Sequence, residues 1–111
     1  MRTKAKTEPT KTYQGWANYE TWCVALWIDN EEGTYNEWRE RARRALTGAE
    51  PTYRGQSKLE AARIALAGEL KHWLEQSAPG LGPTLWGDLL ATAISEVDVF
   101  EIAGNWLKEL E

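Results

Sequence analysis

The chain has 111 residues, which suits a single domain with one hydrophobic core. Apolar residues make up 42% and charged residues 27%, and this composition excludes a disordered chain or a fibre. The net charge of −4 is unevenly spread, since residues 1–63 carry +2 and residues 64–111 carry −6, and such asymmetry can mark a partner surface.

The sequence divides into an N-terminal tail and a series of predicted helices that are marked by capping residues. Residues 1–14 mix Lys, Thr, Glu and Pro without periodicity, so we expect a flexible tail, followed by one helical domain over residues 15–111. Asn18 is placed to cap a helix over 19–30, which Gly33 would end in a left-handed turn. Thr34 has capping-box spacing and predicts a second helix that reaches about residue 47.

The remaining helices each follow a capping residue and end at a break. They are predicted over residues 58–76, 85–95 and 99–110. Ser57 and Glu60 form a capping box, while Thr84 and Asp98 are the other caps. The sequence therefore predicts an all-α domain, a compact bundle of about five helices.

The apolar positions indicate how these helices pack. The last four are amphipathic, with one face each for the core. The core face of the fourth helix is predicted to consist of Leu85, Trp86, Leu89, Leu90, Ala93 and Ile94. The first helix is apolar on nearly all sides, so we expect it at the centre of the bundle. The small residues Ala61, Ala65 and Gly68 indicate either that another helix crosses the third one closely or, for the two alanines, helix propensity alone.

Seven tryptophans are unusual for this length. Six lie on predicted core faces, namely Trp22, Trp27, Trp38, Trp73, Trp86 and Trp106. Because buried indoles stabilise a small domain, we expect these six in the core, although at least one should reach the surface. Trp16, just before the first helix, is the best candidate for a hydrophobic staple or an exposed anchor.

The sequence contains no motif that names a reaction. Asp29, Glu31 and Glu32 cluster at the C-terminal end of the first helix, where the helix dipole disfavours negative charge. We expect solvent and the nearby arginines to compensate, with a partner-facing acidic patch as the alternative. A hard-cation site is disfavoured, because the loop lacks the alternating oxygen ligands of an EF-hand. We predict no catalytic residue, no cofactor and no metal site, and expect His72 at the surface of a helix end.

Cys23 is the only cysteine, which excludes an intrachain disulfide and favours a reducing compartment. On an apolar helix face it is expected to be a small core residue. No apolar run approaches the roughly 20 residues that span a bilayer, and the N-terminus lacks the apolar segment of a signal peptide. We therefore expect a cytoplasmic protein.

The second helix is rich in arginine. The pairs Glu37–Arg41 and Glu40–Arg44 are spaced to neutralise half of this charge. The candidate nucleic-acid contacts are Arg39, Arg43, Arg44, Arg54 and Lys58. Tyr53 could stack on a base, although a pI of about 5.1 is unlike that of a dedicated nucleic-acid module.

The segment "GWANYETWCVALWIDNEEGTYNEW" carries a resemblance. It is similar to a group of small, largely uncharacterised proteins of bacteriophages, plasmids and related mobile elements, which share an N-[YW]-E-T-W core followed by L-W and an N-[DE]-E-G turn. Residues 85–110 resemble the C-terminal portion of the same group more loosely. The resemblance implies a cytoplasmic accessory protein of a mobile genome that acts by binding host machinery.

We therefore expect a non-enzymatic interaction protein with a host protein as its partner. An inhibitor of a host nuclease or defence system, of the anti-CRISPR or antirestriction type, is the concrete form of this prediction. The candidate contacts are the acidic residues Asp88, Glu96, Asp98, Glu101 and Glu109, which could meet a basic surface.

Two alternatives remain open from the sequence. One is a small nucleic-acid-binding accessory protein that uses the arginine-rich second helix. The other is a structural homo-oligomer formed through surplus apolar surface on the fourth or fifth helix, where Phe100 and Leu107 lie off the main stripe.

Overall fold

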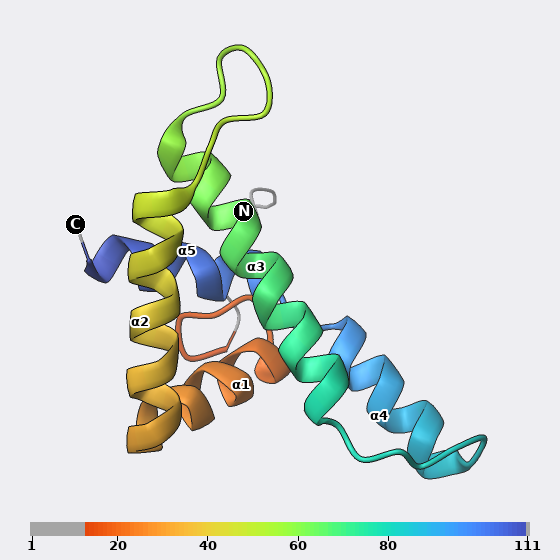
Figure 1. Ribbon diagram of the computed structural model, residues 1–111. Coiled ribbons are helices and arrows are strands. Elements are labelled where there is room, and N and C mark those ends of the chain that lie inside the picture. Colours follow the sequence, from red (N-terminus) through yellow and green to blue (C-terminus); the bar gives the residue numbers. More distant parts are fainter. Residues whose placement is uncertain (1–12, 111) are drawn as a thin grey trace, which may run out of the picture.

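The computed structural model describes residues 13–110, and this range contains five helices and no strand (Figure 1). The helices are α1 (Tyr19–Asn30), α2 (Glu32–Gly48), α3 (Lys58–Ser77), α4 (Leu85–Ser95) and α5 (Val99–Glu109). The predicted all-α bundle of five helices is confirmed. The predicted flexible tail covers residues 1–14, of which residues 1–12 lie outside the described residues. Tyr13 packs its ring against Tyr19 and Trp22 of α1.

Four helices begin where the sequence predicts, because each capping side chain accepts a backbone N–H of the first turn. These caps are Asn18, Ser57, Thr84 and Asp98. The box at α3 is complete, since the Glu60 N–H donates to Ser57 Oγ at 3.0 Å and the Ser57 N–H donates to Glu60 Oε1 at 2.9 Å. In α5 the matching carboxylate, that of Glu101, instead accepts the N–H of Ala17 at 3.0 Å.

The corner between α1 and α2 differs from the prediction. Only Glu31 separates the two helices, and its extended backbone (φ −104°, ψ 118°) makes the turn by itself. Gly33 therefore lies inside the first turn of α2 and does not adopt the predicted left-handed conformation. Thr34 does not cap the helix either, because its hydroxyl donates to the Glu31 carboxylate at 2.8 Å.

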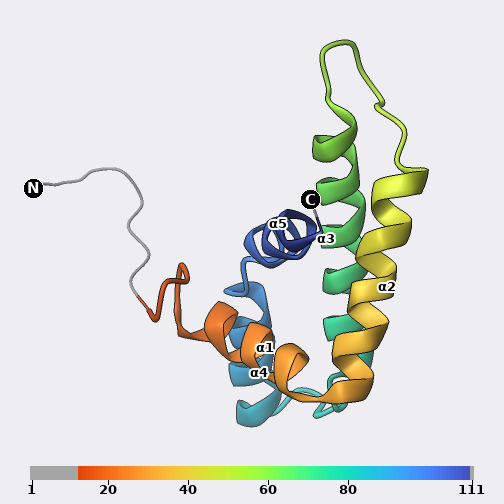
Figure 2. The same ribbon diagram turned by 90° about the vertical axis from the view of Figure 1, so that its left-hand side faces the viewer.

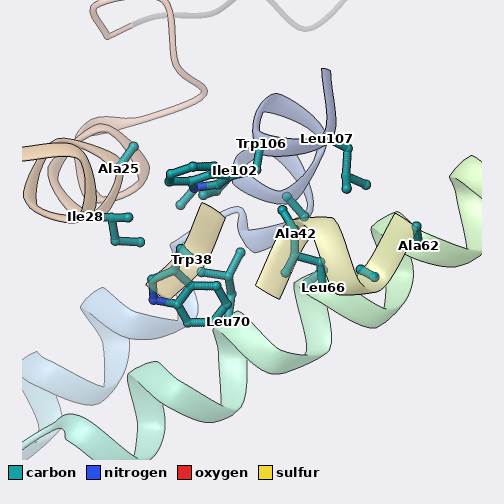
Figure 3. Packing of buried hydrophobic residues seen from close by; sticks show 13 residues of the cluster. Ala25, Ile28, Trp38, Ala42, Ala62, Leu66, Leu70, Ile102, Trp106 and Leu107 are labelled. Carbon is teal, nitrogen blue, oxygen red and sulfur yellow. The ribbon is translucent and has the colours of Figure 1, made fainter. Parts of the chain in front are cut away.

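The core lies between α2, α3 and α5, and the prediction of a central first helix is wrong. The most extensive contact is that of α3 with α5, followed by α2 with α3. Helix α1 packs at one edge of this core through Ala25 and Ile28, which reach the same cluster as Trp38 and Leu70 (Figure 3). Its other side faces solvent, where Trp27 is 67% exposed. An apolar pattern all round a helix thus did not mean that the helix is surrounded.

The tryptophans divide into three groups. Trp38 and Trp106 are buried, Trp22 and Trp73 are half-buried, and Trp27 and Trp86 are exposed. The core prediction is therefore wrong for Trp27 and Trp86. Trp16, the candidate for a hydrophobic staple or an exposed anchor, is half-buried and packs against the core.

The small residues of α3 do not mark a helix crossing. Ala65 and Gly68 are both exposed, and no atom of the described residues lies within 4 Å of the position that a Cβ of Gly68 would take. Helix α3 packs instead through Ala62, Leu66 and Leu70, all with no exposed surface. Figure 2 shows α2 and α3 running side by side, joined by the loop of residues 49–57.

Helix α4 lies outside the core. None of its residues is buried, and Leu85, Trp86 and Leu89 expose 65%, 67% and 53% of their surfaces. In Figure 1, α4 and the C-terminal half of α3 extend away from the place where α2, α3 and α5 meet. The predicted core face of α4 is therefore wrong for its first half, whereas Leu90, Ala93 and Ile94 are half-buried.

Candidate protein-binding surface

An apolar groove with a volume of about 350 Å³ lies between α1, α3 and α4. Its main apolar lining consists of Tyr19, Cys23 and Val24 from α1, Leu74 and Ala78 from the end of α3, and Leu90, Ala93 and Ile94 from α4. We call this feature the apolar groove. Residues from three distant parts of the chain form it, so only the tertiary fold brings them together.

Polar contacts fix one end of the groove. The Asn18 side chain donates from Nδ2 to the backbone oxygen of Glu96 at 2.7 Å. The Thr21 hydroxyl, which is fully buried, accepts the backbone N–H of Asp98 at 2.8 Å and donates to Asn18 Oδ1 at 2.6 Å. These bonds tie the start of α1 to the turn between α4 and α5, so the walls of the groove are held at this end.

The apolar face of α4 continues beyond the groove. Trp86 precedes Leu90 by four residues and Ala93 by seven, a spacing that places all three on one side of a helix. Leu85 and Leu89 adjoin this side and are also exposed. Contiguous exposed apolar surface is typical of interaction sites, and tryptophan is enriched at their energetic centres. The groove and this face of α4 form the candidate binding surface.

Tyr19 and Cys23 bring a hydroxyl and a thiol to the groove. Cys23 is half-buried in the groove wall, not enclosed in the core as predicted. The neighbouring Cys23 thiol raises the pKa of the Tyr19 hydroxyl, by its charge when ionised and by a hydrogen bond. Because the pKa of tyrosine is already near 10, this ring stays uncharged at neutral pH and offers an amphipathic contact surface.

The predicted acidic contacts lie at three different places. Asp98 and Glu101 support the fold at the start of α5, as a cap and as the acceptor for Ala17. Asp88 and Glu96 are exposed, on α4 and just after it. Glu109 lies at the far end of α5. The structure therefore leaves Asp88 and Glu96 as the predicted acidic residues near the exposed face of α4.

Glu109 and Asp29 line a small cavity together with Trp16 and Trp106. Burial, and secondly the charge of Glu109, raise the pKa of the Asp29 carboxyl above its ordinary value. The cavity measures only about 10 Å³, about the space of one water molecule. Within residues 13–110, no group of three or more His, Cys, Asp or Glu side chains is placed to hold a metal ion.

The arginines of α2 pair within the helix and with α3. Arg41 binds Glu37 at 2.6 Å, as predicted, and also reaches Glu69 of α3 at 3.2 Å. Glu40 pairs with Arg43 at 3.4 Å, and not with Arg44 as predicted. In the part of the chain that the structure describes, no ion pair joins these arginines to the carboxylates at the α1–α2 corner, so the expected compensation by arginine is not seen there.

The candidate nucleic-acid contacts lie away from the groove. Arg39, Arg43 and Arg44 are exposed on α2, while Arg54 and Lys58 lie in the 49–57 loop and at the start of α3. This loop and α4 are at opposite ends of the molecule in Figure 1. Tyr53 in the same loop is 61% exposed. The structure thus separates these five basic residues and Tyr53, which we call the basic end, from the apolar groove.

Across residues 13–110, the helices are too short or too polar for any of them to cross a bilayer.

Comparison with known proteins identifies a family. Residues 9–102 match the model of DUF7249, a family of unknown function. This range includes α1 to α4 and the first turn of α5, and therefore every wall of the groove. No curated protein and no solved structure matches the chain. The predicted resemblance to an uncharacterised family is confirmed at this level, while the phage or plasmid origin stays a prediction.

Proposed function

We propose that this chain, which belongs to the DUF7249 family, is a non-enzymatic protein that acts by binding another protein through the apolar groove and the exposed face of α4. The observation that carries the proposal is α4 itself, an apolar helix with no buried residue. A tryptophan buries about 150–250 Å² when fully covered. Covering the exposed two thirds of Trp86 would contribute about 2.5–4 kcal/mol at about 25 cal/mol per Å².

The chemistry of the groove supports a binding role. Among residues 13–110, its walls are almost entirely apolar side chains, and Glu20 is the only charged residue that lines it. Such a surface recognises another molecule by shape and burial. Its few polar side-chain groups, such as those of Tyr19 and Cys23, belong to a mainly apolar surface, which suits binding better than general acid–base or nucleophilic catalysis.

The finer proposal is that the bound protein is a host nuclease or part of a defence system, which the chain inhibits. The similarity of residues 15–38 to small phage and plasmid proteins supports this role. An inhibitor of this kind needs a stable contact surface and no chemistry of its own, and the exposed face of α4 provides such a surface.

A plating assay tests the proposal. The protein is produced in bacteria that carry a restriction or CRISPR system, and the plating efficiency of a sensitive phage is measured for wild type, Leu89→Glu and Ile64→Glu. The control is matched, because Leu89 is 53% exposed on α4 and Ile64 is 52% exposed on α3. A carboxylate buried without a partner is costly, so Leu89→Glu should lose at least about tenfold in protection while Ile64→Glu keeps it.

Two outcomes would count against the proposal. Full protection by Leu89→Glu would remove the α4 face as the contact surface. If wild type protects phage against none of the tested systems, the anti-defence role is rejected and the binding role must be tested by other means.

A second candidate function is nucleic-acid binding by the basic end. The exposed Tyr53 beside Arg54 favours it, since a ring next to cations can stack on a base while the cations hold phosphates. Affinity that depends on phosphate contacts falls steeply with salt. A gel-shift series with single-stranded DNA and RNA tests this function, with Arg43→Glu and Arg44→Glu as the variant, and absence of a shift at low salt rejects it.

For the homo-oligomer alternative, the exposed apolar side chains favour α4 over α5 as the surface that would meet a second copy. Leu107 is buried in the core, and the guanidinium of Arg63 lies 3.8 Å from the centroid of the Phe100 ring. These contacts leave less apolar surface on α5 than on α4. Light scattering over a concentration series distinguishes this alternative, because a monomer at every concentration rejects it.

A further inference from the structure

The negative charge of the chain is concentrated on the segments that form the apolar groove. These segments are α1 (residues 19–30), the end of α3 with its turn (70–79) and α4 with its turn (85–97). Without Asp29, which lines the small cavity beside Glu109 and not the groove, they carry four carboxylates and one lysine, a net charge of −3 out of −4 for the whole chain. The rest of the chain adds only −1, so most of the net negative charge lies on the groove segments.

Individual carboxylates lie beside the apolar surface. Glu20 is part of the groove lining. Glu75 lines an adjoining hollow between α3 and α4 together with Lys71, the only cation of the three segments. Glu96 is exposed at the end of α4, where its backbone oxygen is bound by Asn18. An apolar groove bordered by carboxylates suits an apolar ligand that carries positive charge at its edges.

The walls of the groove also select the conformation of the ligand. All three walls are formed mainly by helices, whose backbone N–H and C=O groups are bonded within each helix. An extended peptide placed there would find few backbone partners, and unpaired buried backbone groups are costly. A helical ligand satisfies its own backbone and needs only side-chain contacts. Since α4 has eleven residues, a helix of about three turns, roughly 16 Å long, would lie along it.

We infer that the apolar groove binds an amphipathic helix of about three turns whose apolar face is flanked by lysine or arginine. This inference rests on the proposed protein-binding function and names the class of partner. A second copy of the chain fits less well, because it would bring the same net charge of −4 to the contact. Nucleic acid is repelled by the same carboxylates.

The test uses the full-length chain and three synthetic peptides. One is an amphipathic helix of leucine and lysine, the second has glutamate in place of each lysine, and the third is a scrambled form of the first. Cys23 is the only cysteine and lies in the groove wall, so the rate of its alkylation by iodoacetamide reports whether the groove is covered. The leucine–lysine helix at saturation should slow alkylation by about tenfold or more, and the other two peptides by less than about twofold.

Charge-reversed variants test the sign of the charge. Glu75→Lys combined with Glu96→Lys should weaken the affinity for the leucine–lysine helix by about tenfold, because two attractions become repulsions. The control combines Glu40→Lys with Glu50→Lys, which makes the same change in net charge on exposed residues away from the groove. This control should change the affinity by less than about twofold. Circular dichroism checks that both variants keep the helix content of the wild type.

Each contrary outcome has its own meaning. Equal protection of Cys23 by the lysine and glutamate helices would overturn the inference and leave the proposed binding function intact. If neither helix protects Cys23, both the inference and the proposal that the apolar groove binds a protein are overturned. Alkylation that slows as the protein itself is concentrated, with a dimer seen by light scattering, would show that a second copy is the occupant and would also overturn the inference.

Discussion

Trp86→Ala should destabilise the fold far less than Trp38→Ala, although both tryptophans lie on faces that the sequence assigns to the core. Trp38 is fully buried, so its removal uncovers about 150–250 Å² and should cost about 4 kcal/mol of unfolding free energy. Only a third of Trp86 is covered, about 50–80 Å², which gives about 1–2 kcal/mol. The better helix propensity of alanine offsets about 0.5 kcal/mol of this, leaving about 1 kcal/mol.

Urea unfolding followed by circular dichroism measures both values. Trp27→Ala is the control, because Trp27 is also 67% exposed and should match Trp86. If Trp38→Ala fails to fold, Trp38→Phe gives a measurable lower bound on the cost at that site. A loss at Trp86 within about 1 kcal/mol of the loss at Trp38 would refute the reasoning, because α4 would then pack into the core of the free protein and the groove would be closed.

Three further substitutions each test a single site, and urea unfolding measures the change in stability that each one causes. Asn18→Ala removes a helix cap and the bond to the Glu96 backbone, and should cost about 1–2 kcal/mol; an unchanged midpoint would contradict this. Burial and Glu109 raise the pKa of Asp29, so the contribution of this carboxyl to stability falls as pH rises from 3.8 through the raised pKa; Asp29→Asn should be the more stable protein at neutral pH, with no difference well below pH 3.8. Gly68→Ala should add about 1 kcal/mol, since nothing lies near the new methyl group, and a loss would show a contact there.

The helix boundaries were largely predictable, because capping is local. The cap at Ser57 and its partner Glu60 lie three residues apart, so the sequence shows both groups at once. The prediction failed at the α1–α2 corner, where Gly33 and Thr34 each carry a plausible signal. The chain turns through the extended backbone of Glu31, so neither a left-handed Gly33 nor a Thr34 cap is needed. No residue type predicts an extended conformation of this kind at a single position.

The candidate binding surface was not predictable in the same way. The periodicity of Trp86 and Leu90 shows that the two side chains share a face, but a pattern of this kind is the same whether the face packs against its own chain or stays exposed. The groove also joins Cys23 to Leu74 and Leu90, which are far apart in the sequence. The sequence alone shows the excess of carboxylates after residue 63, but only the fold places one of them, Glu75, in a hollow that adjoins the groove.

The one-residue link at Glu31 restricts how the chain can vary in length. An extra residue within α1 next to this link would turn the rest of that helix by about 100° about its own axis. Ile28 would then leave its place against Trp38, and Cys23 would rotate off the lining of the groove. The loop of residues 49–57 joins α2 and α3 away from both features, so added or deleted residues should be accepted in that loop and rejected at the corner.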